Sequence, residues 1–184
     1  MTNSIILITG IMAAGKSTIA QALAERLPRS VHVRGDQFRR FIVNGRADMN
    51  GTTLSDEAVE QLRLRYRLAA DAARTYAGAG YSVVLQDIYL GDDLAAMVER
   101  LKPYRCHVVV LCPSPEAVHT RGENRQATRG KVAYQPDGID VHTLDHALRH
   151  ETPRIGLWLD TSTMTIEETV DAILMRRDEA VVEM

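Results

Sequence analysis

A glycine-rich stretch near the amino terminus has residue types and spacing that suit the binding of a polyphosphate. Gly10 and Gly15 are separated by four residues, and Lys16 and Ser17 follow directly. A loop that wraps phosphates must aim several backbone N–H groups inward, and glycines allow that close approach. The lysine can then bridge the β- and γ-phosphates, while the hydroxyl coordinates Mg²⁺. The pattern therefore predicts a phosphate-binding loop for ATP and Mg²⁺.

The segments on either side of this loop support the prediction. Residues 4–9 form a nearly continuous apolar run, as a buried parallel strand requires, and residues 18–27 carry apolar residues at helical spacing. The positive end of that helix would add to phosphate binding. An ordinary glycine turn is the alternative. We expect the nucleotide to contact Gly10, Ile11, Met12, Ala13, Ala14, Gly15, Lys16, Ser17 and Thr18.

A candidate general base follows the short apolar run at 31–33, which we expect to form the second strand. Asp36 stands there, and phosphoryl transfer to an alcohol requires a carboxylate that orients the hydroxyl and accepts its proton. Helix N-capping is the alternative role for Asp36. Arg40 lies one helical turn later, where its guanidinium could bind substrate or restrain the carboxylate. Arg39 points elsewhere, and a solvated surface arginine is the alternative for both.

A second carboxylate follows the third predicted strand. Asp87 comes directly after Gln86, at a position where phosphoryl-transfer folds often place an acid that holds magnesium. We therefore predict that Asp87 and Ser17 hold Mg²⁺, with water between Asp87 and the metal. If Gln86 fills the usual acidic position, Asp87 instead faces the acceptor and binds substrate. A structural aspartate in a turn is the remaining alternative.

Three arginines recur at intervals of four residues and share one helix face before Gly130 ends the helix. They are Arg121, Arg125 and Arg129. Charge that develops on a transferring phosphoryl group needs guanidinium donors as a site closes. The spacing predicts a lid over about 121–140, in which Arg125 and Arg129 stabilise the phosphoryl group and Arg125 contacts the nucleotide. A solvated helix face is the alternative.

Two further periodic sets are predicted to do no chemistry. His142, His146 and His150 recur every four residues, but no acid of the zinc-protease type lies between them, so an amphipathic ridge is favoured over a zinc site. The arginines Arg63, Arg65 and Arg67 alternate at two residues and scatter around their helix. We interpret all three as solvated surface.

Repeated alternation of apolar runs with helical patterns predicts an α/β fold. A three-layer P-loop architecture with a five-stranded parallel sheet accommodates this order. The other strands are expected at 31–33, 81–85, 107–112 and 155–159, and the other helices at 37–44, 56–77, 93–101, 115–128, 141–150 and 166–176. Polar residues after each strand would then gather at one edge of the sheet, where the loop after Asp160 is expected to border the adenine.

Length, composition and charge limit the classes of protein. The 184 residues are 45% hydrophobic with a net charge of −2, which favours a single domain over 1–184 and no general attraction to nucleic acid. The sequence begins without an apolar signal and has no run of about twenty apolar residues. Cys106 and Cys112 are expected to be buried free thiols. These features predict a cytoplasmic protein without membrane or nucleic-acid partners.

The motifs occur in the order seen in chloramphenicol phosphotransferase-like kinases, which the chain resembles over nearly its whole length. They are the loop at 10–18, the strand end Gly35-Asp36, the stretch 86–91, the segment 125–130 and Asp160-Thr161-Ser162. The resemblance implies a fold of the nucleoside-monophosphate-kinase type. It also implies Asp36 as the base, with Arg125 and Arg129 as phosphate ligands. Gln86 departs from the second acid that chloramphenicol phosphotransferase carries.

The segment Gly35-Asp36-Gln37-Phe38-Arg39 is also similar to adenylylsulfate kinases and to the kinase half of polynucleotide kinases. We therefore expect an ATP- and Mg²⁺-dependent kinase that transfers the γ-phosphoryl group to a hydroxyl of a small molecule, such as the antibiotic chloramphenicol. Lys16, Asp36, Arg125 and Arg129 are its expected catalytic residues. The alternatives are a 5′-hydroxyl polynucleotide kinase and a nucleotide-binding switch without phosphotransfer.

Overall fold

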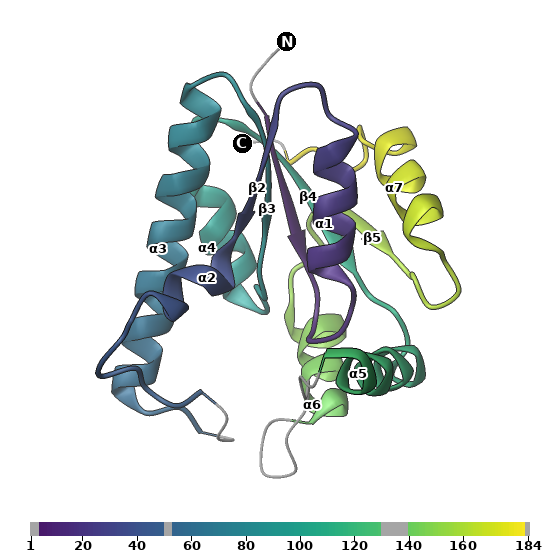
Figure 1. Ribbon diagram of the computed structural model, residues 1–184. Helices are drawn as coiled ribbons and strands as arrows, with labels where there is room; N and C mark the ends of the chain where they lie inside the picture. The colour runs from purple at the N-terminus through teal and green to yellow at the C-terminus, as the bar shows by residue number, and fades with distance from the viewer. Residues whose placement is uncertain (1–3, 50–52, 130–139, 183–184) are drawn as a thin grey trace.

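A parallel sheet of five strands forms the centre of the protein (Figure 1). The computed structural model describes residues 4–49, 53–129 and 140–182, except for the side chains of residues 125, 126, 128 and 129. Every neighbouring pair in the order β2-β3-β1-β4-β5 is parallel, which confirms the predicted α/β architecture. The strands are β1 (Ser4–Thr9), β2 (Ser30–Arg34), β3 (Ser82–Gln86), β4 (Arg105–Leu111) and β5 (Leu157–Leu159).

Helices cover both faces of this sheet. Figure 1 shows α3 and α4 on one side and α1 and α7 on the other, with α5 and α6 beyond the carboxyl ends of the strands. The helices are α1 (Lys16–Glu25), α2 (Gly35–Arg40), α3 (Asp56–Gly78), α4 (Asp92–Arg100), α5 (Pro115–Arg129), α6 (Val141–His146), the π-helix η1 (Ala147–Glu151) and α7 (Ile166–Met175). Among these described helices, none combines the length and hydrophobicity needed to cross a bilayer.

Burial explains why the strands could be recognised as continuous apolar runs. All six residues of β1 and the last six of β4 are buried, because helices pack on both faces of the central strands. The edge strands β2 and β5 are only partly buried. Cys106 and Cys112 are free and buried, as predicted.

The long helix α3 has a capped N-terminus and packs on the sheet through small side chains. The Ser55 hydroxyl accepts a hydrogen bond of 3.2 Å from the Ala58 amide, which satisfies one of the helix's free N–H groups. The face that packs on the sheet carries the buried alanines Ala69, Ala70, Ala73 and Ala77. Their small volume lets the helix axis approach the strands closely, and this places the side chains of α3 near the ends of β2 and β3.

Gly80 and Gly156 both have positive φ, but only Gly156 is also closely packed against a strand. Gly156, at φ +73°, leads into β5, and an added Cβ would overlap the Val108 carbonyl. Gly80, at φ +86°, has nothing within 4 Å of such an atom. We predict that Gly80→Ala lowers the free energy of unfolding by about 1 kcal/mol through backbone strain alone. Gly156→Ala should lower it by about 3 kcal/mol, because steric overlap adds to the strain.

Urea-induced unfolding followed by circular dichroism measures both losses. Gly80→Ala is the matched control, since it makes the same change at the same sign of φ without the overlap. Equal losses in the two variants would show that the contact with Val108 does not contribute.

Candidate active site

A cavity of about 900 Å³ lies at the carboxyl edge of the sheet. Its walls come from the loop after β1, the ends of β2 and β3, α2, Arg65 of α3, the middle of α5, and the segment that joins β5 to α7. Polar residues that follow different strands therefore line one cavity at this edge, as the sequence predicted.

The loop between β1 and α1 has the backbone that phosphate binding requires. Gly10, Ala13 and Gly15 all have positive φ, at +150°, +61° and +97°, and these turn the loop back around its own N–H groups. A Cβ at Gly10 would lie 2.5 Å from the Leu111 carbonyl oxygen, so β4 leaves room only for glycine there. The Lys16 ammonium donates a hydrogen bond of 2.7 Å to the Ile11 carbonyl within the loop. The lysine is thus positioned at the mouth of the phosphate-binding loop.

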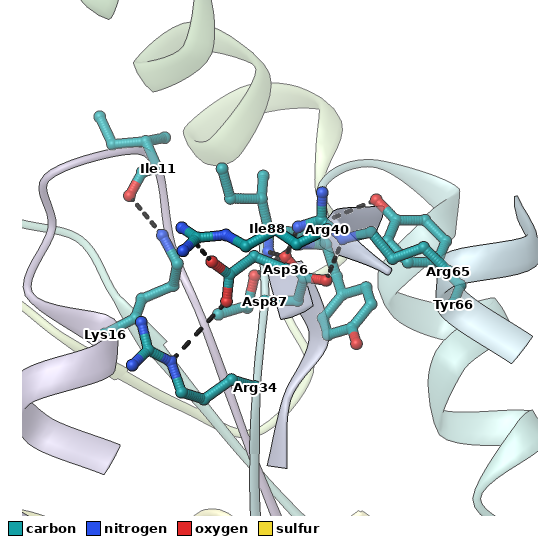
Figure 2. A network of polar contacts seen from close by, with 11 residues as sticks. Ile11, Lys16, Arg34, Asp36, Arg40, Arg65, Tyr66, Asp87 and Ile88 are labelled. Atoms are coloured by element: carbon teal, nitrogen blue, oxygen red, sulfur yellow. Dashed lines mark hydrogen bonds and ion pairs between the residues drawn. The ribbon is translucent and has the colours of Figure 1, made fainter. Parts of the chain in front are cut away.

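Asp36 lies in the same cavity, immediately after β2. Arg40 donates a hydrogen bond of 3.1 Å to Oδ2 of Asp36, and the Nε atom of Arg34 lies 3.8 Å from Oδ1 (Figure 2). The Oδ1 atom is buried and accepts no hydrogen bond from the described residues. Asp36 does not cap α2, because the N-cap residue is Arg34 and no side chain bonds to the free N–H groups there. The carboxylate therefore retains an unused acceptor.

The segment that follows α2 is held by two side chains that the sequence analysis did not single out for this role. Arg39 points away from Asp36, as predicted, and donates a hydrogen bond of 2.6 Å to the Ala47 carbonyl. Gln61 of α3 donates to the Gly45 carbonyl at 2.8 Å and accepts from the Ala47 amide at 3.0 Å. These bonds hold the segment after α2 against α2 and α3.

A buried ion pair forms the floor between the phosphate-binding loop and Asp36. Arg65 of α3 donates to both carboxylate oxygens of Asp87: Nε lies 2.7 Å from Oδ2, and Nη2 contacts Oδ1 (Figure 2). The Ile88 amide donates a further bond of 2.8 Å to Oδ1. The Asp87 side chain is 2% exposed and that of Arg65 is 13% exposed. β3 ends at Gln86, so Asp87 is the first residue beyond the strand.

The prediction that Arg65 is solvated was wrong. Arg63 and Arg67 are four residues apart and share one face of α3, whereas Arg65 lies two residues from each and is on the opposite side. Arg65 lies four residues from Gln61 and from Ala69, which are both buried, and so it shares their face. Arg63 and Arg67 are exposed as predicted.

Electrostatics and close packing both act on the Asp87 carboxylate. Burial raises the pKa of Asp87 above its ordinary value, and the Arg65 guanidinium and the more distant Lys16 ammonium oppose this shift. Gly35 packs directly on the carboxylate, and an added Cβ there would overlap Oδ2. Glycine at position 35 is thus needed for the start of α2 to lie against the Asp87 carboxylate. It is the sequence signal that could have revealed this close packing.

Arg121 joins the two sides of the nucleotide half of the cavity. Its guanidinium donates to the Thr161 carbonyl, and Nη1 lies 3.3 Å from the Ala14 carbonyl oxygen. The middle of α5 is therefore tied both to the phosphate-binding loop and to the segment after β5. The side chains of Arg125 and Arg129, and residues 130–139 of the expected lid, lie outside the described part of the chain.

The two predicted magnesium ligands both lie at the cavity. Ser17 and Asp87 both line the cavity and offer the hard oxygen donors that Mg²⁺ prefers. Three of the four acceptor sites of the Asp87 carboxylate are used by Arg65 and Ile88, so its free capacity suits contact through a water molecule. His146 and His150 stack with ring centroids 4.8 Å apart. Within the described residues, no cluster of three or more His, Cys, Asp or Glu side chains could hold a metal.

Comparison with known proteins identifies the fold. A family model described as AAA domain matches residues 5–153. No curated protein matches the sequence. An unliganded sugar kinase from Janibacter sp. HTCC2649 is similar in structure, with a TM-score of 0.67 and 19% identity over 98% of this chain and 96% of that one.

Two further structures also align with a TM-score of 0.67. The tunicamycin resistance protein of Deinococcus radiodurans is 17% identical and covers 98% of this chain and 99% of its own. The APS kinase of Mycobacterium tuberculosis, in complex with AMPPNP and APS, is 17% identical over 95% and 97%. These likenesses confirm the predicted P-loop fold of the kinase type.

Removal of the Arg65 cation should lower the stability of the protein in a pH-dependent way. We predict that Arg65→Gln lowers the free energy of unfolding by about 3 kcal/mol at pH 8, because it leaves a buried carboxylate without its partner. With its pKa raised above the unfolded value, Asp87 takes up a proton more readily in the folded variant. The loss should therefore shrink as the pH falls toward 5 and grow as it rises.

Urea-induced unfolding at several pH values between 5 and 8 measures this dependence. Arg67→Gln makes the same change two residues away on the exposed face of α3, and it should alter stability by less than about 0.5 kcal/mol. A loss in Arg65→Gln that is small, or that does not vary with pH, would contradict the ion-pair assignment.

Proposed function

The chain belongs to the AAA-domain family, and from this premise and the geometry of its cavity we propose that it is an ATP- and Mg²⁺-dependent kinase. In this proposal the γ-phosphoryl group is transferred to a hydroxyl of a small molecule. Lys16 and Asp36 are its central catalytic residues, and both line the same cavity.

One observation carries the proposal: the buried Oδ1 atom of Asp36 accepts no hydrogen bond from the described residues. A buried acceptor without a donor lowers stability by about 1–3 kcal/mol, so such an atom calls for a partner that the protein alone does not supply. A hydroxyl bound in the cavity would donate to it. The same hydrogen bond would orient that hydroxyl for attack and receive its proton.

The chemical step follows from this arrangement. The acceptor oxygen forms a bond to the γ-phosphorus as its proton passes to Asp36, and the bond from that phosphorus to the β,γ-bridging oxygen breaks, releasing ADP. Lys16 and the backbone N–H groups of residues 10–18 stabilise the phosphate charge. Arg125 and Arg129, on the last turns of α5, complete this role in the proposal. Arg40 keeps the Asp36 carboxylate oriented through its hydrogen bond to Oδ2.

The residues present fit a bound magnesium ion. Ser17 would hold it directly and Asp87 through water, as their positions at the cavity wall allow. When bound with the nucleotide, Mg²⁺ supplies charge neutralisation on the β- and γ-phosphates.

The nucleotide base belongs on the opposite side of the cavity from Asp36. Thr161, Met164 and Ile166 line that side, between β5 and α7. Arg121 borders it and is already held by the Thr161 carbonyl. The combination of apolar side chains with a few fixed polar groups is typical of a small-molecule pocket.

Substitution of the base gives the most specific prediction. Asp36→Asn should lower kcat by about 100- to 10,000-fold, because an amide keeps the shape and cannot accept the proton. Binding of ATP should stay within about threefold of the wild-type value, since Asp36 belongs to α2 and lies outside the phosphate-binding loop. Asp71→Asn, on the exposed face of α3, is the matched control.

The assay uses γ-labelled ATP, Mg²⁺ and separate pools of hydroxyl-bearing compounds. The pools hold antibiotics including chloramphenicol, sugars and sugar acids, nucleosides, adenosine 5′-phosphosulfate, and a 5′-hydroxyl oligonucleotide. Label in a small-molecule pool that disappears in Asp36→Asn supports the proposal. Label confined to the oligonucleotide would favour the polynucleotide kinase. ATP binding without label in any pool would favour a nucleotide switch, and equal transfer by Asp36→Asn would remove Asp36 as the base.

A further inference from the structure

The charged residues that line the cavity are unequally divided between cations and anions. Two carboxylates face five cationic side chains, and the full set is Lys16, Arg34, Asp36, Arg40, Arg65, Asp87 and Arg121. Lys16 lies on the phosphate-binding loop, and Arg121 is bound to the segment after β5. Both therefore serve the nucleotide half. The remaining three arginines and two aspartates surround the place of the acceptor.

Within the acceptor half, one arginine and one aspartate neutralise each other. Arg65 and Asp87 form a buried bidentate pair, so their charges cancel in the local balance. The local balance then depends on Arg34 and Arg40 against Asp36 alone. Two guanidinium groups share one carboxylate, which leaves an excess of one positive charge.

Arg34 has most of its donor capacity unused. Its guanidinium makes a single ion pair, at 3.8 Å from Asp36, and donates no hydrogen bond to any described residue. A guanidinium carries five N–H donors in a planar fork that matches the oxygens of phosphate, sulfate or carboxylate. The side chains of Arg34 and Arg40 are 44% and 49% exposed, so a ligand can reach both. Figure 2 shows them on two sides of the Asp36 carboxylate.

The positive excess extends to Arg39, which precedes Arg40 on α2. Burial, followed by the nearby cations of Arg46 and Arg65, lowers the pKa of Arg39, and only Asp48 opposes this among the groups that act on it. The charges around Arg39 therefore supply no net negative charge to the acceptor half. The imbalance also increases during the proposed reaction, because Asp36 becomes neutral when it accepts the proton.

We propose that the acceptor is a small molecule with an anionic group of its own, a phosphate, sulfate or carboxylate, and that Arg34 and Arg40 bind this group beside the reacting hydroxyl. The inference rests on the proposed kinase function and narrows its substrate class. Neutral acceptors such as chloramphenicol leave the two arginines without a partner and are disfavoured. The anion places the hydroxyl next to Asp36 and compensates the arginines as the carboxylate loses its charge.

Inorganic sulfate tests the anion site without any need for turnover. The protein is first saturated with AMPPNP and Mg²⁺, so that the phosphate-binding loop is filled, and sulfate is then titrated by calorimetry. We predict binding that weakens by about 10-fold or more in Arg34→Gln, because a charge-assisted pair is lost. Arg100→Gln, an exposed arginine on α4, should bind sulfate as the wild type does.

Matched acceptors test the same site during catalysis. Gluconate is compared with glucose, glycerate with glycerol, and adenosine 5′-phosphosulfate with adenosine. For a pair that is phosphorylated, kcat/KM should favour the anionic member by about 10- to 100-fold. Arg34→Gln should reduce that ratio toward one, whereas a merely structural role for Arg34 would lower both values and keep the ratio.

The two experiments separate failure of this inference from failure of the kinase proposal. Sulfate binding that is lost in Arg34→Gln, with no acceptor phosphorylated, would overturn phosphotransfer and leave the anion site standing. Equal sulfate binding by wild type and Arg34→Gln would overturn the anion site. Efficient phosphorylation of neutral compounds, at the rate of their anionic partners, would overturn it as well.

Discussion

The ion pair between Arg65 and Asp87 is the interaction on which the rest of the site depends. Asp87 directly follows β3, which lies between the strand that leads into the phosphate-binding loop and the strand that ends two residues before Asp36. A carboxylate this deeply buried needs a cation to remain charged, and α3 supplies it. The pair neutralises the floor of the cavity, so the charge that remains available is that of Lys16, Asp36 and the arginines around them.

The order of strands sets the distance over which the chemistry must occur. Because β3 lies between β1 and β2, the ends of those two strands are separated by two strand spacings, about 10 Å. This span accommodates a γ-phosphoryl group on the loop after β1 and a hydroxyl beside the carboxylate after β2. Gly35 makes the arrangement compact, because Asp87 occupies the space where a Cβ would lie. The sheet and the glycine together determine how close the reacting groups can come.

Much of this was predictable from the sequence because the relevant signals are local. The phosphate-binding loop follows from glycine spacing, the central strands from unbroken apolar runs, and the position of Asp36 from the edge of a parallel sheet. The burial of Arg65 was not predicted, since a spacing of two residues places it opposite Arg63 and Arg67 without showing which side of the helix faces the sheet. Its partner is 22 residues away in sequence, and only the packing of α3 on β3 brings them together.

Of the two arginines that pair with Asp36, only Arg40 could be predicted from the sequence. Helical spacing places Arg40 beside Asp36, as the observed hydrogen bond confirms. Arg34 belongs to the last position of β2, and strand periodicity says nothing of its distance from a residue in the next helix. The roles of Arg125 and Arg129 remain predictions.

The central claim is that Asp36 and the γ-phosphate face one another across the space of a single hydroxyl. A crystal structure of the protein with AMPPNP and Mg²⁺ measures this directly. The account predicts a separation of about 5–6 Å between an Asp36 carboxylate oxygen and the γ-phosphorus, the sum of a hydrogen bond and a near-attack distance. A γ-phosphate directed away from Asp36, or a separation of about 10 Å or more with the cavity closed, would contradict it.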